Sequence, residues 1–414
     1  MDCMRFLTAL RDEARRKIEK ISKADIVIGI PTYYSCGTIE FVIKMVAEGL
    51  RKYFPGKKSI IFISDGGSTD DTREVAMDVD ITNFNQEKIV TIYRGLPGKG
   101  SAIRAIFEAS SFLGADAVAL FDSDLKSIKP EWIKNVLEPV FYGYDFVTPY
   151  YTRYKFDGTI TNTIVYNLTR ALFGANIRQP IGGDFGISRE LIREYLRKDV
   201  WESDIAKFGI DIWLTVEAIV NKFRICQTRL GVKIHGEKDP AADLSGMFTQ
   251  VVGTIFKLMI DNEDYWKEVK GSVDIPILGD VPEEEAKPFQ INKKALLDYF
   301  RAGYKNFGSV WKNIIEVDDY KVVEELFRLS RRSPNRVILP VKTWAHIVYD
   351  YAIAFKKTDI QRFKLLGTLI PIYNLRVASM VNELKDIDDL DAEKYFEEQA
   401  KVFEEEKEYL LKKW

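Results

Sequence analysis

The chain has 414 residues, of which 46% are hydrophobic and 29% charged, the balance of a soluble globular protein with two or three domains. Its net charge of −2 provides no global basic field for nucleic acid or an anionic membrane, and no apolar run reaches the roughly 20 residues of a membrane helix. The three cysteines are scattered and odd in number, which argues against a disulfide framework and favours a reducing cytoplasm.

Residues 1–24 are predicted to form a charged amphipathic helix without the long apolar core of a signal peptide. From residue 25 onward, short apolar runs alternate with helical stretches. Four strands are predicted within "DIVIGIPTYY", "KSIIFISD", "KIVTIYR" and "DAVALFDSD". This alternation predicts a Rossmann-like α/β fold, with a mostly parallel sheet and helices on both faces.

The predicted α/β domain spans residues 25–260. The segment "GDVPEEEAKP" marks a linker over residues 261–285. Residues 286–414 are helical in pattern and rich in aromatic residues, Glu and Lys, so we expect a second, mainly helical C-terminal domain.

Polar residues collect where the predicted strands end, at Pro31 and Thr32, at Asp65, and at Asp122 to Asp124. In a parallel sheet these ends meet at one edge, where ligands bind. On a strand, Asp122 and Asp124 would share a face and could hold Mg²⁺ or Mn²⁺, which bridges to phosphate oxygens. A helix-capping turn explains the same letters, but the position at a strand end favours the metal site.

Two glycine-containing turns could approach a ligand. In "PGKGSA", Gly98 lets the backbone come close and Lys99 can neutralise a phosphate at the start of the next helix. The segment fits neither a P-loop nor a dinucleotide fingerprint, and a flexible turn with a solvated lysine is the alternative. In "SDGGSTDDT", Asp65 could accept hydrogen bonds from a ribose or a base, although a tight turn that caps a helix explains these letters too.

Further acidic and histidine residues could complete the site. Asp184 follows a double glycine in "RQPIGGDFGIS". Asp211 opens an apolar helix, where stabilisation of the helix dipole is an equal alternative. His235 ends a predicted strand and could be a third metal ligand, whereas His346 lies among aromatic residues and is interpreted as a core residue.

Taken in order, "PGKG", "DSD", "QPIGGDFGISREL", "FGID" and "LGVKIHG" resemble the motifs of GT-A glycosyltransferases over roughly residues 25–260. More narrowly, the chain resembles retaining enzymes that glycosylate glycerate or 3-phosphoglycerate, the mannosylglycerate and glucosyl-3-phosphoglycerate synthases. It departs from them in two places. The first strand ends "PTYYSCGT", where many relatives carry an acidic or asparagine-rich turn, and "GGD" replaces the commoner "GGE".

The resemblance implies a donor site, an acceptor site, a metal site and three catalytic residues. The donor-binding residues would be Pro31, Thr32, Asp65, Gly98, Lys99, Asp122, Ser123, Gly182 and Gly183. The acceptor-binding residues would be Arg153, Lys155, Gly158, Thr159 and Thr161. Mg²⁺ or Mn²⁺ would be the cofactor, with Asp122, Asp124 and His235 as its ligands. The catalytic residues would be Lys99, Asp184 and Asp211.

The implied activity is transfer of a hexose from UDP-glucose or GDP-mannose to 3-phosphoglycerate or glycerate with retention of configuration. The implied role is glucosylglycerate or mannosylglycerate synthesis. From the composition we expect a cytoplasmic protein without a nucleic-acid partner or a membrane span, and we predict a homodimer. The metal and Lys99 would stabilise charge on the departing diphosphate. In the front-face mechanism proposed for this family, the leaving phosphate takes the acceptor proton, and Asp184 and Asp211 bind sugar hydroxyls. Arg153 and Lys155 would suit a carboxylic acceptor.

Three alternatives stay open. An inverting GT-A transferase of the polysaccharide or polyprenyl-phosphate type would use an aspartate base and usually membrane attachment, but neither a "QxxRW" motif nor a membrane helix is visible. A sugar nucleotidyltransferase normally carries its glycine-rich stretch after the first strand, where residues 33–37 read "YYSCG" here. A non-catalytic scaffold, whose helical region binds a partner, is the third alternative.

Overall fold

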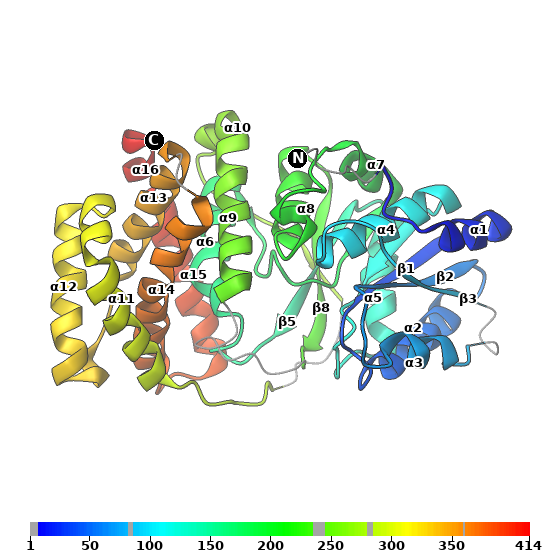
Figure 1. Cartoon of the computed structure of the whole chain (residues 1–414), viewed down its shortest axis with the longest axis horizontal. Coiled ribbons are helices and arrows are strands. Elements are labelled where there is room, and N and C mark those ends of the chain that lie inside the picture. Colours follow the sequence, from blue (N-terminus) through cyan, green and yellow to red (C-terminus); the bar gives the residue numbers. More distant parts are fainter. Residues whose placement is uncertain (1–6, 82–85, 235–244, 280–284, 359–360) are drawn as a thin grey trace. The chain divides into compact units, whose positions relative to one another are not determined.

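The structure is a computed structural model that describes residues 7–81, 86–234, 245–279, 285–358 and 361–414 (Figure 1).

The chain divides into two compact units that are interleaved in sequence. The first unit comprises residues 1–152, 179–236 and 275–284. The second unit comprises residues 153–178, 237–274 and 285–414. The sequence suggests contiguous domains, with residues 25–260 in the α/β domain. In the structure, residues 153–178 and 237–274 belong to the helical unit.

The first unit is built on an eight-stranded sheet with the order β10-β8-β5-β7-β4-β1-β2-β3. Its strands are β1 (Ile26–Thr32), β2 (Ser59–Asp65), β3 (Glu87–Ile92), β4 (Ala117–Leu120), β5 (Phe146–Thr152), β7 (Gly186–Ser188), β8 (Ile225–Val232) and β10 (Ile277–Leu278). Neighbouring strands are parallel except at β7, which runs antiparallel to both β4 and β5. The predicted mostly parallel sheet is therefore confirmed.

Helices cover both faces of this sheet. They are α1 (Asp12–Ile21), α2 (Ile39–Tyr53), α3 (Thr72–Asp78), α4 (Lys99–Leu113), α5 (Pro130–Phe141), α7 (Arg189–Arg197), the short helix η3 (Asp204–Ala206) and α8 (Ile210–Val220). Every residue of β1 is buried, as a parallel strand covered on both sides requires.

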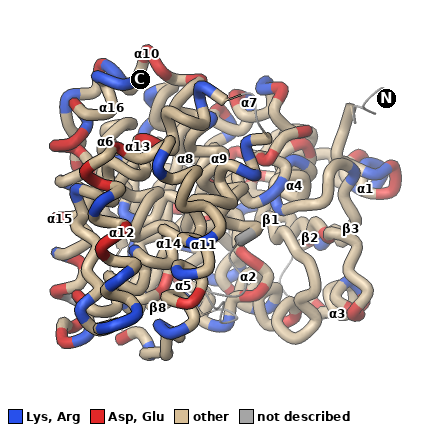
Figure 2. The backbone as a smooth tube through the Cα atoms, turned by 60° about the vertical axis from the view of Figure 1, so that its left-hand side comes forward, with Lys and Arg blue, Asp and Glu red and all other residues tan. Residues whose placement is uncertain are grey.

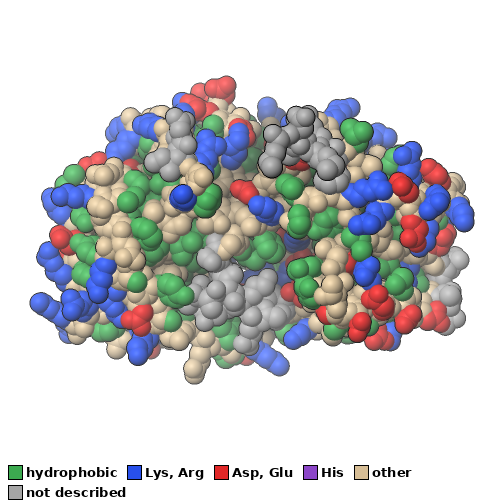
Figure 3. Space-filling model, viewed as in Figure 1, with side chains coloured by type: hydrophobic (Ala, Val, Ile, Leu, Met, Phe, Trp, Pro, Cys, Tyr) green, Lys and Arg blue, Asp and Glu red, His purple; other side chains and the backbone are tan. Residues whose placement is uncertain are grey.

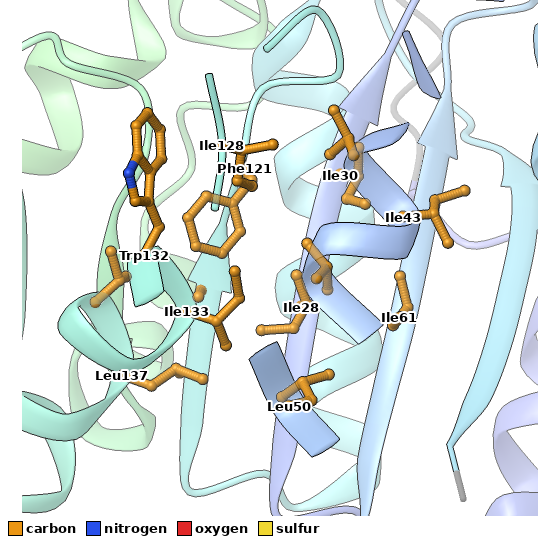
Figure 4. Close-up of a cluster of buried hydrophobic side chains, with 14 of the residues drawn as sticks. Ile28, Ile30, Ile43, Leu50, Ile61, Phe121, Ile128, Trp132, Ile133 and Leu137 are labelled. Carbon is orange, nitrogen blue, oxygen red and sulfur yellow. The ribbon is translucent and has the colours of Figure 1, made fainter. Parts of the chain in front are cut away.

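The core shows how the two faces of β1 are used. On one face, Ile28 and Ile30 pack with side chains of α2 and α5, among them Ile43 and Ile133 (Figure 4). On the other face, Gly29 leaves room for α4, because a Cβ atom at Gly29 would lie 2.4 Å from Cγ2 of Ile106. Successive residues of a strand point to opposite faces, so the sheet is a middle layer between helices.

The second unit is almost wholly helical. It contains the π-helical turn η2 (Thr161–Val165), α6 (Tyr166–Phe173), α9 (Ser245–Asp261), α10 (Glu263–Glu268), α11 (Lys293–Ile314), α12 (Val317–Arg332), η4 (Pro334–Arg336), α13 (Val341–Lys357), α14 (Arg362–Leu384), α15 (Asp389–Glu405) and α16 (Lys407–Lys413). A two-stranded sheet of β6 (Ala175–Asn176) and β9 (Val273–Asp274) completes it. The predicted mainly helical C-terminal region is confirmed.

Charged residues of both signs are distributed over both units. Lys and Arg, and Asp and Glu, are scattered along the backbone in Figure 2, and basic, acidic and apolar side chains are mixed on the face shown in Figure 3. Within the described ranges, no helix combines the length and the apolar character needed to cross a membrane.

Candidate active site

The candidate site lies in the first unit, at the edge where the parallel strands have their carboxyl ends. Lys99 is the first residue of α4, and Asp211 lies in the first turn of α8. Asp122 follows β4, and Asp184 precedes β7. Because β7 is antiparallel, its start lies at the same edge as the end of β4. The structure thus brings together the three residues predicted to be catalytic and one predicted metal ligand.

Lys99 joins two of the carboxylates. Its Nζ lies 2.8 Å from Oδ1 of Asp122 and 3.0 Å from Oδ2 of Asp211. Burial lowers the pKa of Lys99, but the two carboxylates outweigh this effect and raise it above its usual range. Lys99 is therefore a charged ammonium at neutral pH, and the alternative of a solvated lysine does not apply.

Lys233 is a second cation of the cluster, and it is not among the site residues predicted from the sequence. It follows β8, and its Nζ lies 2.9 Å from Oδ2 of Asp122 and 2.7 Å from Oδ2 of Asp184. It also donates a hydrogen bond of 2.9 Å to the carbonyl oxygen of Gly182. One sequence feature does point to Lys233. It lies two residues before His235, at the end of a predicted strand, and other strands of the same sheet end at the other site residues.

Asp184 is fully buried and uses both carboxylate oxygens within the protein. Its Oδ1 accepts the backbone N–H of Asp122 at 2.9 Å, and its Oδ2 accepts the hydroxyl of Tyr151 in addition to Lys233. Burial raises the pKa of Asp184 above its usual value although Lys233 acts in the opposite direction. In this arrangement Asp184 fixes the position of Asp122.

One carboxylate oxygen of Asp211 is left without a hydrogen-bond donor among the described residues. Its Oδ2 pairs with Lys99, whereas its buried Oδ1 has no hydrogen-bond partner among the described residues. Burial raises the pKa of Asp211, and Lys99 only partly offsets this. A buried acceptor without a donor is costly unless a ligand supplies one. A hydroxyl group of a bound molecule could do so.

Gly183 is required by both its conformation and its neighbours. It has a φ of +88°, which residues with a side chain rarely adopt. A Cβ atom here would lie 2.7 Å from Oδ2 of Asp122 and 3.0 Å from Nζ of Lys99. The double glycine therefore lets the backbone pass close beside the ion pairs.

The pair Asp122 and Asp124 differs from the prediction in one respect. β4 ends at Leu120, so the two aspartates lie in the following turn and the argument that they share a strand face does not hold. Desolvation raises the pKa of Asp122, but both of its oxygens bind lysines, and these two cations hold the pKa well below its usual range. Asp124 has no hydrogen bond or ion pair to any residue that the structure describes.

His235 lies outside the described residues, but Ile234, which precedes it, is described. The N–H of Lys126 donates to the carbonyl oxygen of Ile234 at 2.8 Å, and the N–H of Ile234 donates to the hydroxyl of Ser127 at 2.8 Å. The residue before His235 is therefore bonded to the turn that carries Asp124. The described residues contain no group of three or more His, Cys, Asp or Glu side chains that could hold a metal.

The predicted donor residues of β1 and β2 are buried. Thr32 is 4% exposed, and Asp65 is completely buried. Oδ1 of Asp65 accepts the N–H groups of Gly67 and Ser68, and Oδ2 accepts the hydroxyl of Ser68. The motif therefore forms a tight turn, and the buried carboxylate of Asp65 stabilises this turn by accepting its hydrogen bonds. Pro31 lies beside Ser64 in the paired strands.

Two other predicted donor residues have partners inside the first unit. The hydroxyl of Ser123 lies 2.8 Å from that of Ser35, and its carbonyl oxygen accepts the hydroxyl of Thr38 at 2.7 Å. The N–H of Gly98 donates to the hydroxyl of Tyr93 at 2.8 Å.

The predicted acceptor residues all belong to the second unit. Arg153 pairs with Asp157 at 3.0 Å, and Lys155 donates to the carbonyl oxygen of Ile387. The hydroxyl of Thr159 lies 2.5 Å from that of Tyr373. Gly158 and Thr161 belong to the same segment, where Gly158 has a φ of +65° and Thr161 begins η2.

Known proteins are similar to the part of the chain that carries this cluster. The family model described as mannosylglycerate synthase, GT domain, matches residues 62–254, which include both lysines and all three carboxylates of the cluster. Glucosyl-3-phosphoglycerate synthase from Mycolicibacterium paratuberculosis is 27% identical over 235 residues, covering 52% of this chain and 68% of the relative. These relatives are glycosyltransferases. The chain resembles them, and the predicted resemblance and enzyme class are confirmed.

Two further proteins are similar to parts of this chain. Mannosylglycerate synthase from Rhodothermus marinus is 29% identical over 142 residues, covering 31% of this chain and 33% of the relative. A crystal structure of glucosyl-3-phosphoglycerate synthase from Mycobacterium tuberculosis, in complex with Mn²⁺, UDP and phosphoglyceric acid, is 24% identical with a TM-score of 0.44. That similarity covers 58% of this chain and 81% of the solved chain.

Proposed function

We propose that this glycosyltransferase moves a hexose from a nucleotide-sugar to 3-phosphoglycerate or glycerate, with retention of configuration. The main support is the cluster at the carboxyl edge of the sheet, where Lys99 links Asp122 to Asp211. The matched region of the family model contains this cluster, and the relatives carry the names of the corresponding synthases.

The donor diphosphate would bind beside the two lysines. Each lysine holds two of the three carboxylates, Lys99 those of Asp122 and Asp211 and Lys233 those of Asp122 and Asp184. On binding, a phosphate oxygen would replace one of these carboxylate contacts. Lys99 is the first residue of α4, where a helix also favours an anion. Lys99 and Lys233 would stabilise the charge that grows on the departing diphosphate.

The residues also fit a divalent cation such as Mg²⁺ or Mn²⁺. Asp124 offers a carboxylate without a partner among the described residues, and His235 directly follows Ile234, which is bonded to the same turn. Carboxylate oxygens are the ligands that these cations prefer. When bound, the cation would neutralise the diphosphate. Asp122 remains a proposed ligand that could act only if a lysine turned away from it.

The transferred sugar would be held by Asp211. Its unpartnered Oδ1 is available to accept a sugar hydroxyl, while Lys99 holds the other oxygen. Asp184 would act through Asp122, because its own oxygens are all used within the protein. The acceptor proton would pass to the leaving phosphate, as the resemblance implies, since no oxygen of Asp184 is exposed.

The acceptor is proposed to bind the segment with Arg153, Lys155, Gly158, Thr159 and Thr161. The support is the resemblance and the cationic side chains of Arg153 and Lys155. A cytoplasmic location is proposed from the cysteines, of which the two described ones, Cys36 and Cys226, are free thiols. The homodimer stays a prediction.

A substrate panel tests the proposal. The chain is incubated with UDP-glucose or GDP-mannose and with 3-phosphoglycerate or glycerate, with Mg²⁺ or with EDTA, and the products are analysed by NMR. We expect release of nucleoside diphosphate, a product with the donor's anomeric configuration, and at least a roughly 100-fold lower rate for Asp211→Asn. Release of pyrophosphate would indicate a nucleotidyltransferase, and an inverted product would indicate the inverting alternative.

A further inference from the structure

Two exposed tyrosines follow β1 at the edge of the sheet that carries the candidate site. Tyr33 is 60% exposed and Tyr34 is 51% exposed. Their rings are 4.4 Å apart between centroids and meet edge to face at 68°. They lie outside residues 62–254, which the family model matches, in the turn where the sequence departs from the resemblance.

This turn is held in a strained conformation. Tyr34 has a φ of +51°, which is unusual for a bulky residue and typically occurs where the surroundings impose it. The N–H of Tyr34 donates to the hydroxyl of Ser68 at 2.9 Å, and its own hydroxyl lies 3.1 Å from that of Thr69. The next residue, Ser35, donates its N–H to the hydroxyl of Thr72 at 2.8 Å. The turn after β2 therefore fixes the turn after β1.

Tyr33 lies against the glycine turn. A Cβ atom at Gly66 would be 2.9 Å from Cδ2 of Tyr33, so only glycine lets the ring approach this closely. An exposed aromatic ring that is already fixed by its neighbours loses little conformational entropy when a flat ligand stacks on it.

The polar side chains at the ends of β1 and β2, next to this turn, are buried. Asp65 is buried, and both its oxygens accept hydrogen bonds from its own turn. Thr32 is only 4% exposed. A nucleoside at this edge therefore meets aromatic rings first and finds no free oxygen on Asp65.

We propose that Tyr33, supported by Tyr34, is the platform on which the base of the nucleotide-sugar stacks. The inference rests on the proposed function and adds which residue of this chain binds the base of the donor. Stacking is tolerant of the base because every base has a π-face, and Asp65 does not read the base edge. The chain should accordingly bind UDP and GDP with affinities within about tenfold of each other.

Calorimetric titration of the full chain with UDP, GDP and inorganic pyrophosphate, in the presence of Mg²⁺, tests this inference. Tyr33→Ala should weaken UDP and GDP binding about 5- to 150-fold while leaving pyrophosphate binding unchanged. Tyr33→Phe should bind like the unmodified chain. Tyr142→Ala is the matched control, because Tyr142 is 72% exposed and follows α5 at the opposite edge of the sheet. Thermal unfolding confirms that each variant is folded.

The outcomes separate this inference from the proposed function. If the unmodified chain binds UDP or GDP and Tyr33→Ala binds it equally well, the platform is refuted and the proposed function stands. An equal loss of pyrophosphate binding in Tyr33→Ala would also refute it, because the diphosphate site would then be disturbed. If the unmodified chain binds neither nucleotide, the proposed function fails and this inference with it.

Discussion

At the scale of single residues, the site is an ion cluster that is buried at Lys233 and Asp184 and partly exposed at Asp122. The side chain of Lys233 is 5% exposed and that of Asp184 is fully buried. Buried charges are tolerated only when they are paired and hydrogen-bonded, and each member of this cluster meets that condition through a residue from a different element. The cluster should therefore respond strongly to the loss of one cation.

We expect Lys233→Met to lower the free energy of unfolding by about 3–5 kcal/mol, because it removes a cation from the fully buried carboxylate of Asp184 and from the partly exposed one of Asp122. Urea denaturation measures this change. Lys44→Met is the matched control: Lys44 pairs with Glu40 at 2.6 Å, but both side chains are more than half exposed, so the effect should be small. A stability of Lys233→Met equal to that of the control would contradict the account.

Gly183→Ala should lower the rate of sugar transfer at least tenfold, since the new Cβ atom would meet Asp122 at 2.7 Å in a backbone conformation with positive φ. Gly114→Ala controls for the conformation alone, because Gly114 has a φ of +62° and nothing lies within 4 Å of its added Cβ. Gly114→Ala should lose about 1 kcal/mol of stability from the backbone conformation alone, and Gly183→Ala should lose more because of the clash, but only Gly183→Ala should lose activity. Equal activity losses in initial-rate assays would show that the clash is unimportant.

The sequence reveals most of this cluster but not its internal bonding. Lys99, Asp122, Asp184 and Asp211 stand in recognisable motifs, and the structure brings them together. Lys233 does not stand out, because a lysine is usually a surface residue and only the fold shows that it is buried. The sequence also cannot show that the carboxylate oxygens of Asp184 and Asp65 accept hydrogen bonds from the protein itself, because these partners depend on the fold.

At the scale of elements, alternation of apolar runs predicts the strands and helices well, and errors fall at their ends. β4 stops at Leu120, before the aspartates. The antiparallel strand β7 has only three residues, too few for a periodic pattern. The turn after β1 is another such place, since a positive φ at Tyr34 is fixed by partners 34 residues away.

In the helical unit, His346 shows how a packing prediction can be incomplete. It is buried on α13 and stacks on Tyr409 at 3.9 Å, as expected of a core residue. Its ring nitrogens also face two carboxylates, with Nδ1 2.8 Å from Asp319 and Nε2 2.7 Å from Glu406. Burial lowers the pKa of His346, but the bonds to both carboxylates outweigh this effect and raise it.

This pair of bonds predicts a pH dependence of stability. A raised pKa means that the stabilisation by His346 is complete below the pKa of the unfolded chain, about 6.5, and is lost as the pH rises through the folded-state pKa. The loss should be about 1–3 kcal/mol. Urea midpoints measured from pH 6 to pH 9 should fall for the unmodified chain and stay flatter for His346→Gln. Parallel curves for the two proteins would refute the assignment.

At the scale of the whole molecule, the chain leaves the α/β unit and returns to it, so that residues 153–178 and 237–274 belong to the helical unit. Local patterns do not reveal such interleaving, because it depends on which distant segments share a core. The consequence for function is that the proposed acceptor residues and the proposed donor residues are carried by different units.

We propose that the first unit binds a nucleoside diphosphate together with a divalent cation, for which Asp124 and His235 are the expected ligands. The most direct measurement is a titration of the chain with Mn²⁺ in the presence of UDP or GDP, followed by electron paramagnetic resonance. We predict one bound Mn²⁺ per chain, and loss of this binding in both Asp124→Asn and His235→Ala. Unchanged Mn²⁺ binding in either variant would contradict the claim.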